Sequence, residues 1–291
     1  MGKKKYNIPE KFDKMKVTLV GAGGKMGLRL TRNLKDSAYK MAYLEKHEPA
    51  RENLREMGVV VSAEDKEIPD SDIVILAVPD NILGKVSFQI IPKMKTAAMV
   101  YTLDPACTLA GQLCHRDDLC YFIAHPSHPS VFNWEPTEEA QRDYFGGRLA
   151  KHTVVCALFR GPEKDYALGE ALAREMYAPV SKAHRITAEQ MGMLEPGLVE
   201  TLCSTFQVIV SEALEEVIKR GVPAAEAAKD FLLGHINIQL AVLYGEIPGA
   251  VFSDAANKAI VRGKPLLVKE DWKKVFEPEN IREQIRDITS K

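Results

Sequence analysis

The chain has 291 residues, of which 46% are hydrophobic, and its 39 Lys and Arg residues nearly balance 40 Asp and Glu residues. This length allows two domains with substantial cores, and the near-zero net charge excludes the basic field that holds nucleic acid or an anionic membrane. The five cysteines show no Cys-x-x-Cys spacing, and no stretch approaches the ~20 apolar residues that span a bilayer. We expect a cytoplasmic protein with a small-molecule partner.

A glycine-rich turn follows the first apolar strand pattern, at residues 16–20. The sequence Gly-Ala-Gly-Gly-Lys-Met-Gly at 21–27 leads into a helical pattern that ends near Leu34. In a dinucleotide-binding loop, separate glycines make the tight turn, admit a pyrophosphate and let the helix pack on the strand. The spacing is one residue longer than the common Gly-x-Gly-x-x-Gly. The residues expected to contact the cofactor here are Gly21, Gly23, Gly24, Lys25, Met26 and Gly27.

The second strand pattern, residues 41–44, ends at Glu45. This carboxylate lies 24 positions after Gly21, close to the spacing of about 20 at which an acidic residue binds the adenine ribose hydroxyls. Glu45 therefore favours NAD over NADP. Two alternatives stay open: Glu45 is only a solvated strand end, or nearby Lys46, His47 and Arg51 accommodate a 2′-phosphate.

Alternating strand and helix patterns continue to about residue 183. Residues 73–78 have the continuous apolar character of a strand buried on both faces. Further strand patterns cover 97–103, 119–124, 154–159 and 179–183. This succession predicts an α/β protein with a Rossmann-type, doubly wound, mostly parallel sheet. Because ligands bind at the carboxyl ends of parallel strands, Val78 and Asn81 are expected to border the cofactor.

The pattern changes after residue 185. Apolar residues between Val199 and Val217 follow helical spacing for several turns, a second helical block follows Pro223, and no strand pattern returns. We therefore expect an NAD-binding Rossmann domain over residues 1–185. An all-helical domain for substrate binding and dimerisation is expected over residues 186–291.

Two His-Pro pairs follow the strand pattern at 119–124. His125 and His128 are each followed by proline, which pushes the preceding residue toward extended geometry and stiffens the loop. An imidazole titrates near working pH and can accept a proton from an alcohol. Both histidines are therefore candidate catalytic residues. The alternative is that they only bond loop backbone groups.

The helical part contributes two further candidates. Glu195 precedes a proline in a mostly apolar stretch, where a carboxylate needs a partner such as histidine or a metal. His235 shares a helix face with Gln239 in a segment that is apolar nearly all round and is therefore expected to be buried. A core histidine without catalytic function is the alternative for His235.

The same four residues could also hold a divalent metal. Imidazole and carboxylate ligands suit zinc, iron or manganese. The candidate ligands would be His125, His128, Glu195 and His235, but no helical His-x-x-x-His or other fixed ligand spacing supports a metal from the sequence.

The glycine loop, the strand end at Ala77–Asp80 and the long helix after residue 185 resemble the 6-phosphogluconate and β-hydroxyacid dehydrogenase superfamily. The segments at 124–129, 189–201 and 234–237 resemble a narrower group, whose helical part is named after a phosphogluconate dehydrogenase C-terminal domain. That group includes the D-apionate oxidoisomerases. The resemblance implies oxidation of a branched hydroxy acid with NAD and a shift of a carbon substituent, which gives 3-oxo-isoapionate.

One difference from the hydroxyacid dehydrogenases affects the expected mechanism. Those enzymes carry a Lys, with an Asn four residues later, at the start of the long helix. The matching stretch here offers Gln190, Met191, Leu194 and Glu195, without a lysine. The resemblance therefore implies that a carboxylate and histidines replace the lysine. This is similar to ketol-acid reductoisomerases, whose acidic residues on a helical domain help to drive an alkyl shift.

The resulting hypothesis is an NAD-dependent oxidoreductase of a small polyhydroxy carboxylate in sugar-acid breakdown, with D-apionate oxidoisomerase as the specific candidate. Alternatives are a plain β-hydroxyacid dehydrogenase without isomerisation, and a cofactor-binding sensor of NAD or NADH without turnover. A helical second domain in this superfamily usually dimerises, so a homodimer is expected.

Overall fold

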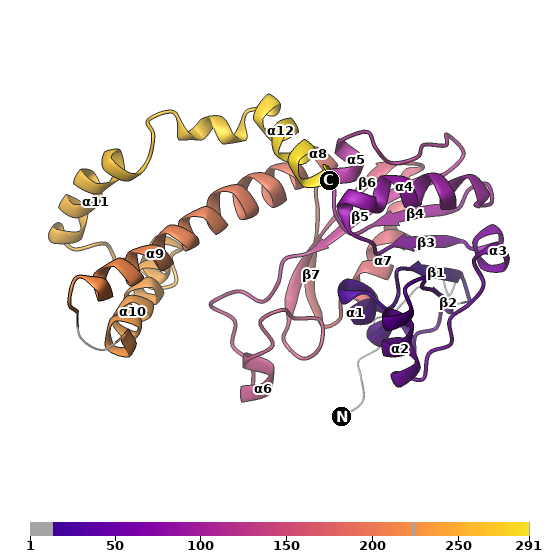
Figure 1. Ribbon diagram of the computed structural model, residues 1–291, viewed down its shortest axis with the longest axis horizontal. Helices are drawn as coiled ribbons and strands as arrows, with labels where there is room; N and C mark the ends of the chain where they lie inside the picture. Colours follow the sequence, from indigo (N-terminus) through magenta and orange to yellow (C-terminus); the bar gives the residue numbers. More distant parts are fainter. Residues whose placement is uncertain (1–13, 223–224, 291) are drawn as a thin grey trace. The chain divides into compact units, whose positions relative to one another are not determined.

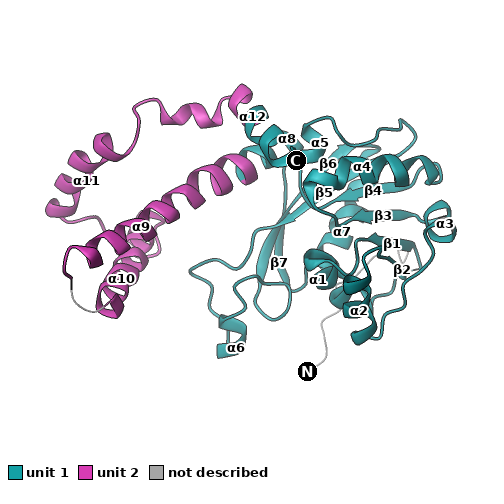
Figure 2. Cartoon of the chain, viewed as in Figure 1, with its two compact units in different colours: residues 1–194, 282–291 teal, residues 195–281 magenta. Residues whose placement is uncertain are grey.

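The computed structural model describes residues 14–222 and 225–290. The chain divides into two compact units, which comprise Met1–Leu194 with Arg282–Lys291, and Glu195–Ile281 (Figure 2). We expected a boundary near residue 185. The units separate later because α8 (Ala188–Gly192) packs its apolar residues Ala188 and Met191 against Ile123 of the sheet.

The first unit contains a seven-stranded sheet with the order β2-β1-β3-β4-β5-β6-β7 (Figure 1). All neighbouring strands are parallel except β5 and β6, which are antiparallel. The strands are β1 (Lys16–Val20), β2 (Lys40–Leu44), β3 (Ile73–Leu76), β4 (Met99–Thr102), β5 (Cys120–Pro126), β6 (His152–Arg160) and β7 (Val180–Arg185). The predicted doubly wound, mostly parallel sheet is confirmed.

Helices cover the sheet on both faces because its strands are apolar on both. The α-helices of this unit are α1 (Lys25–Leu34), α2 (Glu48–Glu56), α3 (Glu64–Glu67), α4 (Asp80–Ile90), α5 (Ala106–Leu109), α6 (Glu138–Gln141), α7 (Tyr166–Met176), α8, and the part of α12 (Pro278–Thr289) from Arg282 onward. Short 3-10 helices lie at Ile68–Asp70, Ile91–Lys93 and Glu163–Asp165.

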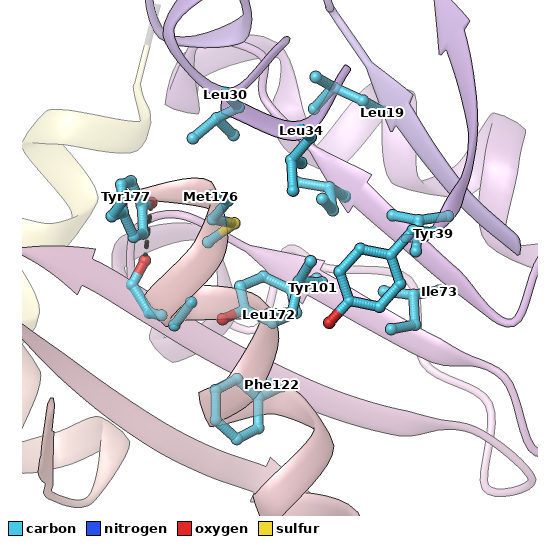
Figure 3. Packing of buried hydrophobic residues seen from close by; sticks show 14 of the residues in the cluster. Leu19, Leu30, Leu34, Tyr39, Ile73, Tyr101, Phe122, Leu172, Met176 and Tyr177 are labelled. Carbon is cyan, nitrogen blue, oxygen red and sulfur yellow. Dashed lines mark hydrogen bonds between the residues drawn. The ribbon is translucent and has the colours of Figure 1, made fainter. Parts of the chain in front are cut away.

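Alternate residues of the central strands enter two separate cores. On one face, the sheet packs against α1 and α7, and Figure 3 shows Leu30, Leu34, Leu172 and Met176 of these helices. The opposite core contains Leu83 and Ile90 of α4, together with the strand residues whose side chains point to the other face of the sheet. The three layers fix the carboxyl ends of β1 to β4 at one edge, and this edge positions the candidate site.

The described residues of the second unit form helices joined by turns and irregular segments, with no strand. It contains most of a π-helical stretch at Met193–Ser204, which begins two residues before the unit does, then α9 (Thr205–Lys219), α10 (Ala225–Leu243), α11 (Asp254–Leu267) and a 3-10 helix at Trp272–Phe276. Pro196 lies inside the π-helical stretch, where a missing N–H group disrupts regular α-helical bonding. The predicted helical character after residue 185 is confirmed.

The apolar character of these helices bears on two sequence expectations, one of which is wrong. The run Ala188–Lys219 contains an 18-residue window with mean hydropathy 1.2, and by length and composition it could cross a membrane. A core or interface helix passes the same test, so this result carries no membrane assignment. We also expected the helix around His235 to be buried, but α10 has no buried residue within this chain. Apolar side chains all round a helix predict burial without identifying the covering surface.

Candidate active site

The glycine-rich loop between β1 and α1 has no room for side chains at three of its glycines. A Cβ atom added at Gly21 would lie 2.4 Å from the carbonyl oxygen of Ala77, and one at Gly23 would lie 2.1 Å from that of Ala50. A Cβ atom at Gly27 would lie 1.9 Å from the carbonyl oxygen of Gly21. Gly21 also has φ +79°, which favours glycine. These glycines therefore allow the close turn and the close helix packing of a dinucleotide-binding loop.

Gly24 has a different function from the other three glycines. A Cβ atom there would have its nearest neighbour at 3.4 Å, which is an ordinary contact. Gly24 is the N-cap residue of α1, and no side chain caps this helix end. The first turn of α1 carries no acidic residue and begins with Lys25. The exposed N–H groups, the helix dipole and this lysine together suit an anion such as a pyrophosphate.

Glu45 lies beside the glycine loop, at the end of β2. Its Oε2 accepts a hydrogen bond from the backbone N–H of Gly23 at 3.1 Å. Its Oε1 accepts from the N–H groups of Lys46 at 2.8 Å and His47 at 3.0 Å. Arg51 donates through Nε to the carbonyl oxygen of Glu45 at 2.7 Å. The carboxylate is thus fixed next to the loop, where an adenine ribose is held in related folds.

Val78 and Asn81 follow β3 at the same edge of the sheet. A methyl group of Val78 lies 2.9 Å from the position that a Cβ atom on Gly21 would occupy, so Val78 packs against the tight turn. Asn81 is exposed in the first turn of α4. Both residues therefore lie at the carboxyl end of β3, and their contact with the cofactor stays a prediction.

His125 is held at the end of β5 by two neighbouring acceptors. Its Nδ1 lies 2.9 Å from the carbonyl oxygen of Leu103 and 3.7 Å from a carboxylate oxygen of Asp104. A carbonyl oxygen can only accept, so Nδ1 carries the hydrogen and Nε2 carries the lone pair in the neutral ring. The side chain is 19% exposed. This oriented, half-buried imidazole is suited to accepting a proton or binding a cation.

Asp104 was not among the residues that we selected from the sequence. Its Oδ1 accepts from the backbone N–H of Ala106 at 2.7 Å, so it fixes the start of α5 as well as facing His125. Its position directly after β4 was the available signal, because strand ends of a parallel sheet meet at one edge. Its relation to His125 depends on strand order, which the sequence pattern leaves open.

His128 also bonds a backbone carbonyl group, but it lies in the loop after β5, whereas His125 lies within the strand. Its Nδ1 lies 2.9 Å from the carbonyl oxygen of Phe145, which again leaves the lone pair on Nε2. The residue is exposed and has φ +57°, a left-handed conformation that is uncommon for histidine. Both histidines thus bond loop backbone groups, as the alternative interpretation expected, and these bonds also orient the rings.

Cys107 lies near Asp104 but is not a candidate nucleophile. Burial, together with the nearby carboxylates of Asp80 and Asp104, raises the pKa of its thiol to about 12. The thiolate, which is the reactive form, is therefore scarce at neutral pH. The candidate reactive groups at this edge are therefore the imidazole of His125 and the carboxylate of Asp104.

The remaining two candidates belong to the second unit. Glu195 is half-buried in the π-helical stretch at Met193–Ser204. His235 is exposed on α10, where its Nδ1 bonds the carbonyl oxygen of Phe231 at 2.7 Å and its ring lies 4.2 Å from the Phe231 ring. The i, i+4 bond fixes the orientation of this imidazole along the helix.

Two family models match the chain. A model for the NADPH-binding domain of acetohydroxy acid isomeroreductase matches residues 11–127, and one for the phosphogluconate dehydrogenase (decarboxylating) C-terminal domain matches residues 133–289. The curated D-apionate oxidoisomerase of Cupriavidus necator is 51% identical over 95% of this chain and 100% of its own length. The chain belongs to the D-apionate oxidoisomerase family.

Other members of the family support the same assignment. The D-apionate oxidoisomerase of Rhizobium rhizogenes is 47% identical over 94% of this chain and 99% of its own length. A crystal structure of a semialdehyde dehydrogenase NAD-binding protein from Cupriavidus necator, in complex with calcium and NAD, has 51% sequence identity and a TM-score of 0.92. The structural match covers 95% of this chain and 100% of the chain in that crystal structure. The fold is therefore shared over nearly the whole chain.

Proposed function

We propose that this chain is an NAD-dependent oxidoisomerase of D-apionate or a closely similar branched sugar acid. The observation that carries the proposal is the near-full-length similarity to curated D-apionate oxidoisomerases, at 51% and 47% identity. The test is the formation of NADH with D-apionate and with linear aldonic acids of the same charge. Turnover of D-apionate at a kcat/KM above about 10⁴ M⁻¹s⁻¹ is expected for a natural substrate. Preference for a linear acid would contradict the proposal.

We propose NAD as the cofactor, held by the loop at 21–27 with Glu45, Val78 and Asn81. The N-terminus of α1, which has no side-chain cap and no acidic residue in its first turn, fits a pyrophosphate. The related Cupriavidus necator structure contains NAD, which supports this choice. When bound, NAD supplies the hydride acceptor for oxidation of a hydroxyl group.

Replacing Glu45 with glutamine is expected to reduce the preference for NAD. A neutral amide loses the charged acceptor for ribose hydroxyls and removes the repulsion against a 2′-phosphate, close to Arg51. We expect NAD affinity to fall about tenfold, or about 1.4 kcal/mol, and the NAD/NADP ratio of kcat/KM to fall further. Steady-state kinetics with both cofactors measures this ratio. An unchanged ratio would show that Glu45 does not contact the ribose.

His125 is the proposed base toward the hydroxyl group that loses hydride. Its Nδ1–H bond to Leu103 and the adjacent Asp104 orient the ring and stabilise the imidazolium that forms when Nε2 accepts the proton. This matches a general rule of base catalysis, in which a third group orients the base. His128, with its lone pair also on Nε2, is proposed to accept a hydrogen bond from a second substrate hydroxyl.

We propose Glu195 as the catalytic carboxylate. We propose that His235 makes a further contact with the substrate. A divalent cation is an alternative proposal, because a cation held by Nε2 of His125 would take the lone pair that proton transfer needs. The Asp104 carboxylate and the His125 imidazole fit a cation chemically, and His125 has the Nδ1–H···O=C bond typical of metal-binding histidines. A bound cation would supply charge stabilisation of substrate oxygens. We expect Glu195→Gln to lower kcat about a hundredfold, and a wild-type kcat in this variant would contradict the role of Glu195.

The cation proposal predicts that EDTA lowers the activity reversibly. Activity that is insensitive to EDTA would contradict a bound cation.

We propose that the helices of the second unit assemble into a homodimer. Large apolar side chains are exposed on all three long helices, among them Phe206, Phe231, Ile238, Leu243 and Val261. Stable monomers rarely expose apolar surface on this scale, and a second copy of the chain presents the same apolar faces. Helix α9, which forms the second half of the run Ala188–Lys219, is then an interface helix, and its apolar character needs no membrane.

Ile238→Asp is expected to dissociate the dimer. Ile238 is 47% exposed in the single chain, so an aspartate costs little in a monomer but places a charge inside an apolar interface. Sedimentation velocity should show a loss of association of at least about 100-fold. The control is Lys229→Glu on the same helix, a charge change at an exposed polar position. A wild-type protein that sediments as a monomer would contradict the proposal.

A further inference from the structure

The loop between β5 and β6, residues 127–151, is attached to the helix that begins at the glycine-rich loop. Asn33 of α1 donates to the carbonyl oxygens of Gly147, Met176 and Ala178 at 3.0–3.2 Å. Arg29, one turn earlier on α1, donates through Nη2 to the carbonyl oxygens of Phe145 and Gly146. Helix α1 and the loop that carries His128 are therefore connected by side-chain hydrogen bonds.

Arg29 is the central group of this attachment. It is only 6% exposed, and burial lowers the pKa of its guanidinium, which nevertheless remains a cation because arginine is not deprotonated in proteins. The guanidinium carbon lies 4.8 Å from the centroid of the Phe145 ring, within the range of a cation–π contact. A buried cation is costly, so its retention here requires a specific contribution from the groups that it bonds.

The loop backbone follows a path that fits around this guanidinium. Gly147 has φ +74°, and a Cβ atom there would lie 2.7 Å from Nε of Arg29. The carboxylate of Asp143 accepts from the backbone N–H groups of Leu149 at 2.9 Å and Ala150 at 3.1 Å, which closes the turn. The loop backbone, including the carbonyl group of Phe145, therefore packs closely around the guanidinium.

The same carbonyl group orients His128. The carbonyl oxygen of Phe145 accepts from Arg29 and lies 2.9 Å from Nδ1 of His128. The ring of His128 also packs edge-on against that of Phe145, with 5.0 Å between centroids. The backbone of His128 is left-handed, a conformation that surrounding contacts must maintain. One acceptor thus sets both the tautomer and the position of this imidazole.

We infer that Arg29 is a positioning residue for substrate binding, which acts through the Phe145 carbonyl group on His128. By holding this acceptor, Arg29 keeps hydrogen on Nδ1 of His128 and leaves Nε2 to accept from a hydroxyl group of the sugar acid. The inference deepens the proposed function and rests on the assignment of His128 to a substrate hydroxyl. It assigns a role in substrate affinity to a buried residue on the cofactor helix.

The first test compares Arg29→Met with Arg29→Lys and Asn33→Ala. Methionine retains much of the volume but cannot donate, and we expect KM for the sugar acid to rise about tenfold while KM for NAD changes less than about twofold. The Arg29→Lys variant keeps the positive charge, so its KM for the sugar acid should lie between those of the wild type and Arg29→Met. Asn33→Ala weakens the same loop attachment without touching the Phe145 carbonyl group, so it should change KM for the sugar acid less than about twofold.

The second test is a double-mutant cycle with His128→Ala. If Arg29 acts through His128, adding Arg29→Met or Arg29→Lys to His128→Ala should change KM for the sugar acid less than about twofold. A full additional tenfold rise would show a merely structural role and overturn the inference, as would an unchanged KM in the single Arg29 variants. Arg29→Lys keeps the cycle measurable if Arg29→Met does not fold. Wild-type KM in His128→Ala alone would instead refute the proposed substrate contact of His128.

Discussion

His125→Ala is expected to lower kcat by about a thousandfold, because it removes the group proposed to accept the proton as hydride leaves. The structure presents this imidazole with Nδ1 bonded to the Leu103 carbonyl group and beside Asp104, so Nε2 is the basic nitrogen. Substrate and NAD affinities should change much less than kcat, since proton transfer contributes mainly in the transition state. Single-turnover measurement of NADH formation separates the chemical step from product release.

His125→Asn is the matched control for this variant. An asparagine amide nitrogen can replace Nδ1 as donor to the Leu103 carbonyl group but provides no base. We expect this variant to melt near the wild-type temperature and to be as inactive as His125→Ala. If either variant retained more than about a tenth of the wild-type kcat, His125 could not be the base.

Gly27→Ala is expected to impair both folding and cofactor binding. The added methyl group would lie 1.9 Å from the Gly21 carbonyl oxygen, so α1 must move away from β1. Overpacking of this kind costs about 1–3 kcal/mol of unfolding free energy. A displacement of about 1 Å at a positioned binding group costs about a hundredfold, and we expect NAD affinity to fall by that factor. Thermal unfolding and fluorescence titration with NAD measure the two effects.

Gly24→Ala in the same loop separates steric conflict from a general effect of alanine. A Cβ atom at Gly24 has its nearest neighbour at 3.4 Å, so the unfolding free energy of the Gly24→Ala variant should stay within about 0.5 kcal/mol of wild type. Equal destabilisation by the two substitutions would mean that the close packing of α1 on β1 is not what selects Gly27.

The sheet and the cofactor loop could be predicted from the sequence because local rules determine them. Buried parallel strands such as Ile73–Leu76 are continuously apolar, and tight turns need glycine at positions such as Gly21. Glu45 was selected as a candidate in the same way, from its position at a strand end, and its carboxylate lies beside the glycine loop. The spacing of residues along the chain carries this information directly.

Other features of the site depend on contacts between distant residues. Asp104 faces His125 because β4 and β5 are neighbours, and Arg29 reaches a carbonyl group 116 positions further along the chain. In the sequence, Arg29 is an ordinary polar residue on an amphipathic helix. The expected burial of His235 was wrong because an apolar helix gives no indication of whether its own chain or a second copy covers it.

The most direct test of the proposed function is NMR analysis of the product formed from D-apionate and NAD by the full-length enzyme. The proposal predicts one NADH per product molecule and a carbon skeleton in which a substituent has moved, as in 3-oxo-isoapionate. An oxidised product with the original skeleton would indicate a plain β-hydroxyacid dehydrogenase. Binding of NAD without any NADH formation would contradict an enzymatic role and favour a sensor.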